Sequence, residues 1–286
     1  MTTIAAFPVA AGTRRLGEVI AWTCSGVTVT HPALVAALAD AGLDESVARE
    51  LAPKHAFTRA CKKLSDQRII RQVGEDPAAV RFQFTHEARA GDTFEYTLET
   101  LLTLDKGTGR VTCDRPGLAT LAQEHLDHAL GARTGADVTR VLQKLFDRHA
   151  DLFPVRPQGG CYFVPDRHAG FVDRVQAMLG RINGQILRFP VPAGTPEGDR
   201  SVKESVAAGL AALIADYRRA VAEFGRDTRP DALERAADRI RRTRLKVEGY
   251  AELLSDERAR LDRELAAARD ELRARVEELA AAGAAT

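Results

Sequence analysis

A nine-residue pattern that occurs twice, at residues 58–66 and 139–147, is the feature that most limits the fold of this chain. Thr, Arg, Lys, Leu and Asp fall at the same places in both copies. Each copy has the composition of the second half of a helix, and each precedes an apolar stretch, a turn and a second apolar stretch. The spacing of roughly 80 residues is the size of a domain rather than the period of a solenoid. The pattern therefore predicts two units, each with a helix followed by a β-hairpin.

Charge is balanced along the whole chain of 286 residues. Residues 1–115 hold 14 basic and 14 acidic side chains, residues 116–198 hold 9 and 8, and residues 199–286 hold 18 and 18, which gives the net charge of +1. A domain that binds nucleic acid through phosphate charge alone is usually basic. Any contact with DNA must therefore be weak, come from a local patch, or need several subunits.

Cysteine usage and hydropathy indicate the compartment. The four cysteines lie far apart without a Cys-x-x-Cys pair, which is typical of reduced thiols in the cytosol. No apolar run approaches the roughly 20 residues that cross a bilayer, and residues 1–8 lack the basic segment and apolar core of a secretory signal. We therefore expect a cytoplasmic protein with no membrane contact, and the abundance of Ala and Arg is typical of a GC-rich bacterial source.

Residues 14–113 predict helices followed by an antiparallel β-meander. The expected helical part comprises, in order, a helix at about 15–24, a short strand at 27–29, a helix from about 30 to 43, a short helical piece after Asp44 and a basic helix at 53–65. Alternating apolar residues then predict strands at about 69–73, 80–85, 93–104 and 110–113.

Residues 116–189 predict a second unit of similar order. The expected elements are a helix from about 118 to 131, the second basic helix at 137–149, strands at 152–155 and 161–164, a helix from Asp166 to about 179, and a strand at 185–189. A stretch rich in proline and glycine at 189–198 follows and predicts a linker.

The C-terminal part predicts two long helices, at 201–226 and about 231–281. Ser201 and Glu204 form a capping-box pattern for the first, and the second would be roughly 75 Å long if it were continuous. A polar helix with a narrow apolar seam cannot bury itself alone, so it must pair with the preceding helix, another subunit or a partner protein. The seam, predicted to carry oligomerisation, consists of Leu254, Leu261, Leu265, Leu272, Val276 and Leu279.

The repeated helices carry the candidate binding residues. Residues three or four apart share one face of a helix, so the cations of each copy form a stripe. Such a stripe can lie in the major groove of DNA, or it can be an ordinary solvated surface. The predicted nucleic-acid-binding residues are Arg59, Lys62, Lys63, Arg140, Lys144 and Arg148.

Signals for catalysis or cofactors are weak. The sequence has no Gly-x-Ser-x-Gly elbow and no glycine-rich nucleotide loop. His125 and His128 lie one helical turn apart, but a structural zinc site needs four ligands at recognisable spacings, and surface histidines explain them better. We therefore expect a non-enzymatic protein with no metal and no cofactor.

The order of elements in residues 14–113, and less completely in 116–165, together with the two Thr-Arg-x-x-x-Lys-Leu helices, resembles the winged helix-turn-helix superfamily. The expected fold class is α+β and mostly helical: tandem winged-helix-like units with an antiparallel β-meander, followed by a C-terminal helical hairpin or coiled coil. The expected domains are 1–115, 116–189 and 201–286, with a linker at 190–200. DNA binding is what this resemblance implies, because fold alone does not fix function.

Two functions fit these patterns better than a third, an enzyme that works through Cys161 or His168, in which alanine at either residue would destroy an activity without unfolding the protein. The first is a DNA-associated protein, such as a transcription regulator, a replication accessory or a DNA-organising factor, that assembles through its C-terminal helices. The second is an adaptor or scaffold whose winged helices and coiled coil dock a partner such as an ATPase, with no DNA contact. Charge reversal on the basic helices distinguishes them, because it should abolish DNA binding and spare partner binding.

Overall fold

We describe the fold from a computed structural model, which covers residues 14–66, 68–90, 92–156, 158–225 and 227–284. The fold is α+β and mostly helical, as predicted, with antiparallel strands and a helical C-terminal segment. Residues 1–8, for which we predicted no secretory signal, lie outside the described part. Among the described helices, none is long and apolar enough to cross a membrane.

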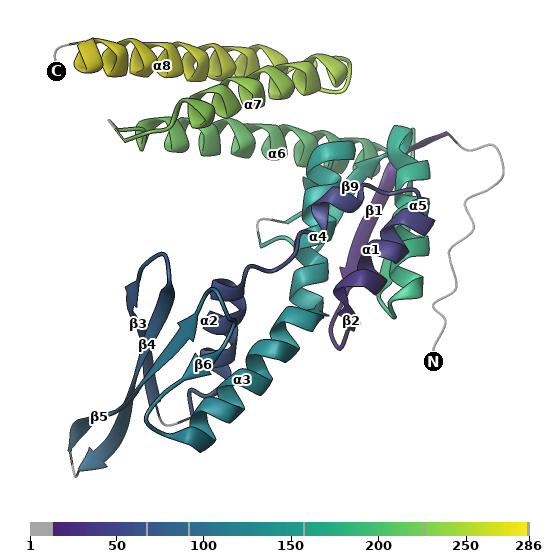
Figure 1. Cartoon of the computed structure of the whole chain (residues 1–286). Coiled ribbons are helices and arrows are strands. Elements are labelled where there is room, and N and C mark those ends of the chain that lie inside the picture. The colour runs from purple at the N-terminus through teal and green to yellow at the C-terminus, as the bar shows by residue number, and fades with distance from the viewer. Residues whose placement is uncertain (1–13, 67, 91, 157, 226, 285–286) are drawn as a thin grey trace. The chain divides into compact units, whose positions relative to one another are not determined.

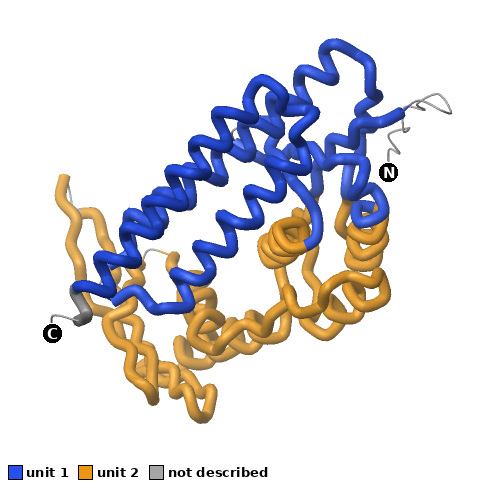
Figure 2. Tube along the Cα trace, turned by 90° about the horizontal axis from the view of Figure 1, so that it is seen from above, with its two compact units in different colours: residues 1–22, 149–172, 186–286 blue, residues 23–148, 173–185 orange. Residues whose placement is uncertain are grey.

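The chain divides into two compact units, and each is built from separate stretches of sequence (Figure 2). Unit 1 holds residues 1–22, 149–172 and 186–286, and unit 2 holds residues 23–148 and 173–185. This division differs from the predicted domains. The predicted second unit is split, because its first helix packs into the core of the residues before it.

Unit 2 contains the predicted meander together with its helices (Figure 1). The helices are α1 (His31–Asp40), the short η1 (Glu45–Val47), α2 (Pro53–Lys63), α3 (Pro116–Gly131), most of α4 (Gly135–His149) and the second half of α5 (Ala169–Arg181). The meander has the order β3 (Arg68–Glu75), β4 (Ala79–Ala90), β5 (Thr93–Asp105) and β6 (Val111–Thr112), each antiparallel to the next. A separate short ladder joins β2 (Thr28–Thr30) to β7 (Ala132–Thr134).

One face of the meander is buried against α2 and α3. Phe82 and Phe84 of β4 and Leu102 of β5 project into this core, where they meet apolar residues of both helices. The ring of Phe57 from α2 packs edge-on against Phe82, with ring centroids 5.4 Å apart. Burial of α3 in this core explains why residues 116–148 belong to unit 2.

Unit 1 combines a four-stranded sheet with three long helices (Figure 1). The strands lie in the order β10 (Gln185–Pro192), β1 (Arg15–Thr23), β9 (Tyr162–Pro165) and β8 (Phe153–Pro154). The helices are α6 (Pro196–Ala222), α7 (Pro230–Gly249) and α8 (Arg258–Ala284). Gly209 lets α6 lie close to the sheet, since a Cβ atom there would meet the ring of Phe153 at 2.8 Å.

The helix predicted at residues 15–24 is wrong, because this segment is strand β1. Gly17 pairs with Pro165 of β9, and a Cβ atom at Gly17 would lie 2.2 Å from the carbonyl oxygen of Val164. Trp22 stacks on Tyr162 with ring centroids 4.9 Å apart. Close strand pairing thus decides the structure of this segment, and the first helix of the expected winged-helix order is absent from it.

The predicted linker at 190–200 is also largely wrong, since β10 continues to Pro192 and α6 already begins at Pro196. Proline is tolerated in the first helical turn because its missing N–H needs no partner there. Ser201 and Glu204 therefore lie inside α6 and do not cap it. Asp166, expected to cap the next helix, instead lies in the short η2 (Asp166–His168), 3.2 Å from the Arg15 guanidinium.

The predicted long C-terminal helix is broken at residues 250–257, so the segment has three helices rather than a hairpin. α7 ends at Gly249, and the next residue, Tyr250, is buried with its hydroxyl 2.6 Å from the Asp151 carboxylate. This anchor turns the chain, and α8 then packs along α6 and α7. α8 continues to Ala284, beyond the end predicted at about residue 281.

Candidate nucleic-acid interface

The two basic helices of the repeat meet in unit 2 at the carboxylate of Asp137. Arg59 of α2 donates two hydrogen bonds to it, one from Nη1 to Oδ2 at 2.8 Å and one from Nη2 to Oδ1 at 2.5 Å. Nη1 of Arg140, on α4, lies 3.3 Å from Oδ1. The two stripes are roughly 80 residues apart in sequence, a domain-sized offset, yet they share one carboxylate.

Asp137 is almost fully buried and stays ionised. The backbone N–H and the hydroxyl of Thr134 each donate to Oδ2 over 3.0 Å. Burial alone would raise the pKa of Asp137, but the hydrogen bonds from Arg59 and Thr134 outweigh it and lower the pKa to about 2. The same pairing raises the pKa of Arg59. The carboxylate therefore fixes α2 against the start of α4.

The six predicted DNA-contacting residues fall into two groups of three. Arg59 and Arg140 contact Asp137, and Nη1 of Arg148 lies 2.8 Å from both Asp44 Oδ2 and Ser46 Oγ. The other three, Lys62, Lys63 and Lys144, are exposed and make no hydrogen bond or ion pair with the described residues. We call the six residues together the α2/α4 patch.

The patch is positive even though Asp137 lies within it. Lys63 is one turn from Arg59 on α2, and Lys144 is one turn from Arg140 on α4. These four cations and one carboxylate leave three positive charges. Lysine ammonium groups that lack protein partners are suited to DNA phosphates, whereas the three arginines are held by carboxylates.

The predicted oligomerisation residues are mostly inside unit 1. Leu254, Leu261, Leu265 and Leu272 are buried in the core that α8 forms with α6 and α7. Val276 is 39% exposed and Leu279 is half-buried. The apolar seam of α8 is thus covered by its own chain over most of its length, and only its last turns remain open.

A second buried carboxylate, Asp151 in unit 1, was missed from the sequence. Nζ of Lys246 lies 2.8 Å from Oδ1, while the Tyr250 hydroxyl, His168 Nε2 and Arg167 contact Oδ2. Burial would raise the pKa of Asp151, but these groups outweigh it and hold the pKa far below its usual range. The guanidinium of Arg167 also lies over the Tyr250 ring, 4.4 Å from its centroid.

Sequence signals for the two carboxylates differ. Thr134 and Asp137 have the hydroxyl-x-x-carboxylate spacing of a capping box, which could have marked the start of α4. The partners of Asp151 are spread over residues 167–250, and no spacing rule connects them.

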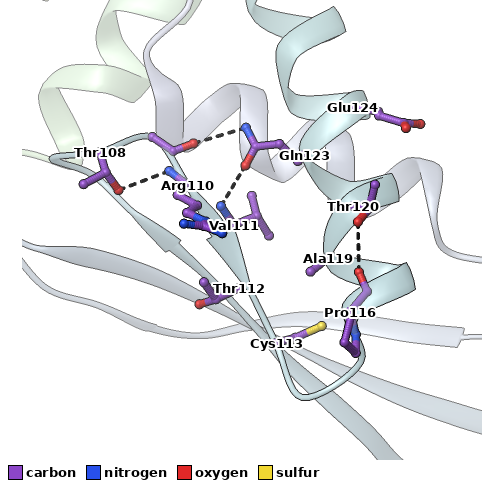
Figure 3. A pocket seen from close by; sticks show the side chains of 11 residues that line it. Thr108, Arg110, Val111, Thr112, Cys113, Pro116, Ala119, Thr120, Gln123 and Glu124 are labelled. Carbon is purple, nitrogen blue, oxygen red and sulfur yellow. Dashed lines mark hydrogen bonds between the residues drawn. The ribbon is translucent and has the colours of Figure 1, made fainter.

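An open cavity of about 620 Å³ lies in unit 2 between β6 and the start of α3 (Figure 3). Gln123 crosses it, accepting from the Val111 N–H at 2.8 Å and donating to the Gly109 carbonyl at 3.3 Å. The Thr120 hydroxyl is bonded to the Pro116 carbonyl. Gln123 and Thr120 thus make internal contacts, and the residues that line the cavity include no nucleophile paired with a base.

Metal ligands and thiols add no further site. In the described part of the chain, no group of three or more His, Cys, Asp or Glu residues could hold a metal ion. All four cysteines are free, and burial raises the pKa of Cys61 to about 12, which keeps it a thiol.

A family model described as a family of unknown function (DUF6744) matches residues 15–285. The chain belongs to this family. The α2/α4 patch, Asp137 and Asp151 lie within the residues that the DUF6744 model matches. No curated protein and no solved structure matches the chain.

Proposed function

We propose that this DUF6744 chain is a non-enzymatic, cytoplasmic DNA-associated protein that contacts duplex DNA through the α2/α4 patch. Transcription regulation, replication support and DNA organisation all fit this activity. The observation that carries the proposal is the convergence of two basic helices on Asp137, which leaves three lysines exposed on the same unit.

The order of elements around α2 supports the proposal. α1, η1 and α2 precede the antiparallel pair β3 and β4, which is the order of a helix-turn-helix followed by a wing. In such domains the last helix before the wing lies in the major groove. Its lysines and those of α4 would contact phosphates, which position a protein on DNA without selecting a sequence.

The balanced charge of the whole chain limits the expected affinity. A patch of this size neutralises few phosphates, so binding should be of the non-specific class and should weaken strongly with salt. Contact by several copies at once would raise the apparent affinity.

Fluorescence anisotropy with a random-sequence duplex, measured over a salt series, tests the proposal. The informative variant replaces Lys62, Lys63 and Lys144 together with Glu, because these residues have no protein partner and their loss should not unfold the chain. We expect at least a tenfold loss of affinity, and the slope of log K against log salt should shrink by about 0.9 for each phosphate contact removed.

The matched control reverses three exposed cations elsewhere. Arg239, Arg242 and Arg263 lie on α7 and α8, and they too have no partner among the described residues. Replacing them with Glu changes the net charge equally and should leave the affinity within about twofold of the native value, because these residues belong to unit 1 and not to the α2/α4 patch. Equal losses in both variants, or no binding by the native chain at low salt, would contradict the proposal and favour the adaptor function.

A further inference from the structure

A strip of large apolar side chains is exposed on the distal half of β5. Phe94, Tyr96 and Leu98 are 55%, 58% and 64% exposed. They alternate along the strand, so they project from one face of the sheet. Their cross-strand neighbours on β4 are polar or charged: Arg89 is opposite Phe94, and Glu87 is opposite Tyr96. A contiguous strip of this kind marks an interaction surface.

The same segment is an edge of the meander. β5 lies between β4 and β6, but the pairing with β6 covers only Thr103 and Leu104. Within the described residues, residues 94–98 are therefore paired with β4 and with no other strand, whereas the side chains of Glu99 and Thr100 also contact Arg115 and Asp114. An open edge of this length presents unpaired backbone groups that favour pairing with another strand.

A second copy of the chain fits this edge because of how its charges are spaced. Two identical antiparallel strands related by a twofold axis place one residue opposite itself, and the remaining residues pair symmetrically about it. With Tyr96 at the centre, Phe94 lies opposite Leu98 and Glu95 lies opposite Thr97. The apolar side chains then meet on one face, and no two carboxylates are opposed.

The registers centred on either neighbour of Tyr96 are unfavourable because they place carboxylates opposite one another. Centring the pair on Glu95 places that carboxylate opposite its own copy, and centring it on Thr97 places Glu95 opposite Glu99. Like charges directly opposite one another destabilise a ladder. In the register centred on Tyr96, Glu99 faces Thr93 and keeps its own partners, with Oε2 2.6 Å from Nε of Arg68.

A register centred on Leu98 fails for a different reason. The ladder between β4 and β5 shifts between Phe84 and Thr85, which leaves Glu99 as an extra residue on β5. Because of this bulge, even-numbered residues of β5 lie on the exposed face before it and on the buried face after it. A register centred on Leu98 would therefore place the buried Thr100 opposite the exposed Tyr96. The bulge therefore ends the segment that can pair.

We propose that two copies of this chain associate by antiparallel pairing of β5 over residues 94–98, with Tyr96 opposite Tyr96. The result is one continuous sheet through both meanders, with a shared apolar strip made of Phe94, Tyr96 and Leu98 from each copy. This assigns self-association to β5 rather than to the predicted C-terminal seam, in which Leu254, Leu261, Leu265 and Leu272 are already buried. The pairing does not depend on DNA binding, although a dimer presents two α2/α4 patches.

Sedimentation velocity of the full chain over a range of concentrations tests the pairing. We expect the native chain to shift to twice the monomer mass as concentration rises. Tyr96→Asp should remain monomeric, since it opposes two carboxylates across the axis. Leu245→Asp, at an apolar position on α7 that is 57% exposed, should associate like the native chain. A native chain that is monomeric at every concentration, or a Tyr96→Asp chain that still associates, overturns the proposal.

Disulfide trapping tests the register in a chain whose partly exposed cysteines, Cys113 and Cys161, are replaced by Ser. Tyr96→Cys should cross-link under mild oxidation, because directly opposed residues have Cα atoms about 4.5–5.5 Å apart, within disulfide range. Leu98→Cys should not, because its copy is displaced by roughly 13 Å along the strand. Cross-linking of Leu98→Cys at the same rate would overturn this register.

A nucleic-acid role for the strip is the competing outcome. Aromatic side chains on an exposed sheet can stack with unpaired bases. A chain that stays monomeric and binds a single-stranded oligonucleotide, with binding lost in Tyr96→Asp, would replace the dimer proposal. Duplex binding by the α2/α4 patch is measured with separate variants, so failure of either proposal leaves the other intact.

Discussion

Asp151 in unit 1 and Asp137 in unit 2 are both buried carboxylates surrounded by cations, but their surroundings differ. Asp151 is 5% exposed and is contacted by Lys246, Arg167, His168 and the hydroxyl of Tyr250. Its partners come from η2 and from the end of α7, so the carboxylate holds the α7 turn to the rest of unit 1.

Asp137 is 9% exposed, and its charged partners, Arg59 and Arg140, belong to the α2/α4 patch. One carboxylate therefore lies within the proposed DNA surface and the other does not. A buried carboxylate surrounded by cations therefore has different consequences in the two units. At Asp151 it holds the end of α7 to η2, whereas at Asp137 it also lowers the positive charge of the proposed DNA surface.

The largest expected effect is on folding, from Asp151→Asn. This change removes the counter-charge of Lys246 and Arg167, whose side chains are partly exposed, and weakens the hydrogen bond that the buried Tyr250 hydroxyl donates, so the free energy of unfolding should fall by about 3 kcal/mol. Urea denaturation followed by the fluorescence of Trp22, the single tryptophan, reports on unit 1. Asp256→Asn, which removes an exposed ion pair with Lys203, should change the free energy by less than about 1 kcal/mol. Equal effects of the two variants would refute the structural role of Asp151.

An intermediate effect is expected from Asp137→Asn, which should lower the free energy of unfolding and raise the affinity for DNA. Neutral Asn loses the negative charge that Arg59 and Thr134 stabilise together, and a pKa lowered from 3.8 to about 2 corresponds to roughly 2 kcal/mol for these contacts after the cost of burial. The same change adds one positive charge to the patch. Affinity for duplex DNA should therefore rise, with a salt slope steeper by up to about 0.9.

Anisotropy titrations of Asp137→Asn and Asp151→Asn, together with their free energies of unfolding, test the contrast between the two carboxylates. Asp137→Asn should be less stable than the native chain yet bind DNA more tightly. Asp151→Asn should be less stable and bind DNA unchanged at temperatures where it is folded. Tighter binding by neither variant would place the DNA contact outside the α2/α4 patch.

Sequence patterns predicted the repeat helices and the meander well, because both depend on local periodicity. Apolar residues at alternate positions mark β3 to β5 as strands, and the helical spacing of buried residues marks α2 and α4. The turn at Lys106-Gly107-Thr108-Gly109 was likewise visible from its glycines.

Features that depend on distant partners were not predictable in this way. β1 has the composition of a short helix, but its close contact with β9 at Gly17 makes it a strand. The seam of α8 was recognised, yet periodicity cannot show whether α6, α7 or another copy covers it. The α2/α4 patch was located residue by residue, whereas its shared carboxylate, Asp137, required the three-dimensional contact.

The smallest expected effect is on the pH dependence of folding, where Asp137 and Asp151 should lose their stabilising contributions over different ranges of acidic pH. A lowered pKa in the folded state contributes stability above the unfolded value, and this contribution is lost as pH falls through the folded value. For Asp137 the loss should occur between about pH 4 and pH 2, given the ordinary value of 3.8 and the lowered value of about 2. Asp151 has a still lower pKa and remains ionised through this window. Both differences in unfolding free energy, that between the native chain and Asp137→Asn and that between the native chain and Asp151→Asn, should therefore shrink as the pH falls from about 4 to 2, because the unfolded carboxyls become protonated there while the folded ones stay ionised. Below about pH 2 the difference for Asp137→Asn should level off, whereas the difference for Asp151→Asn should continue to shrink. Levelling of both differences at the same pH would show that the two carboxylates are equivalent, against the contrast in their partners.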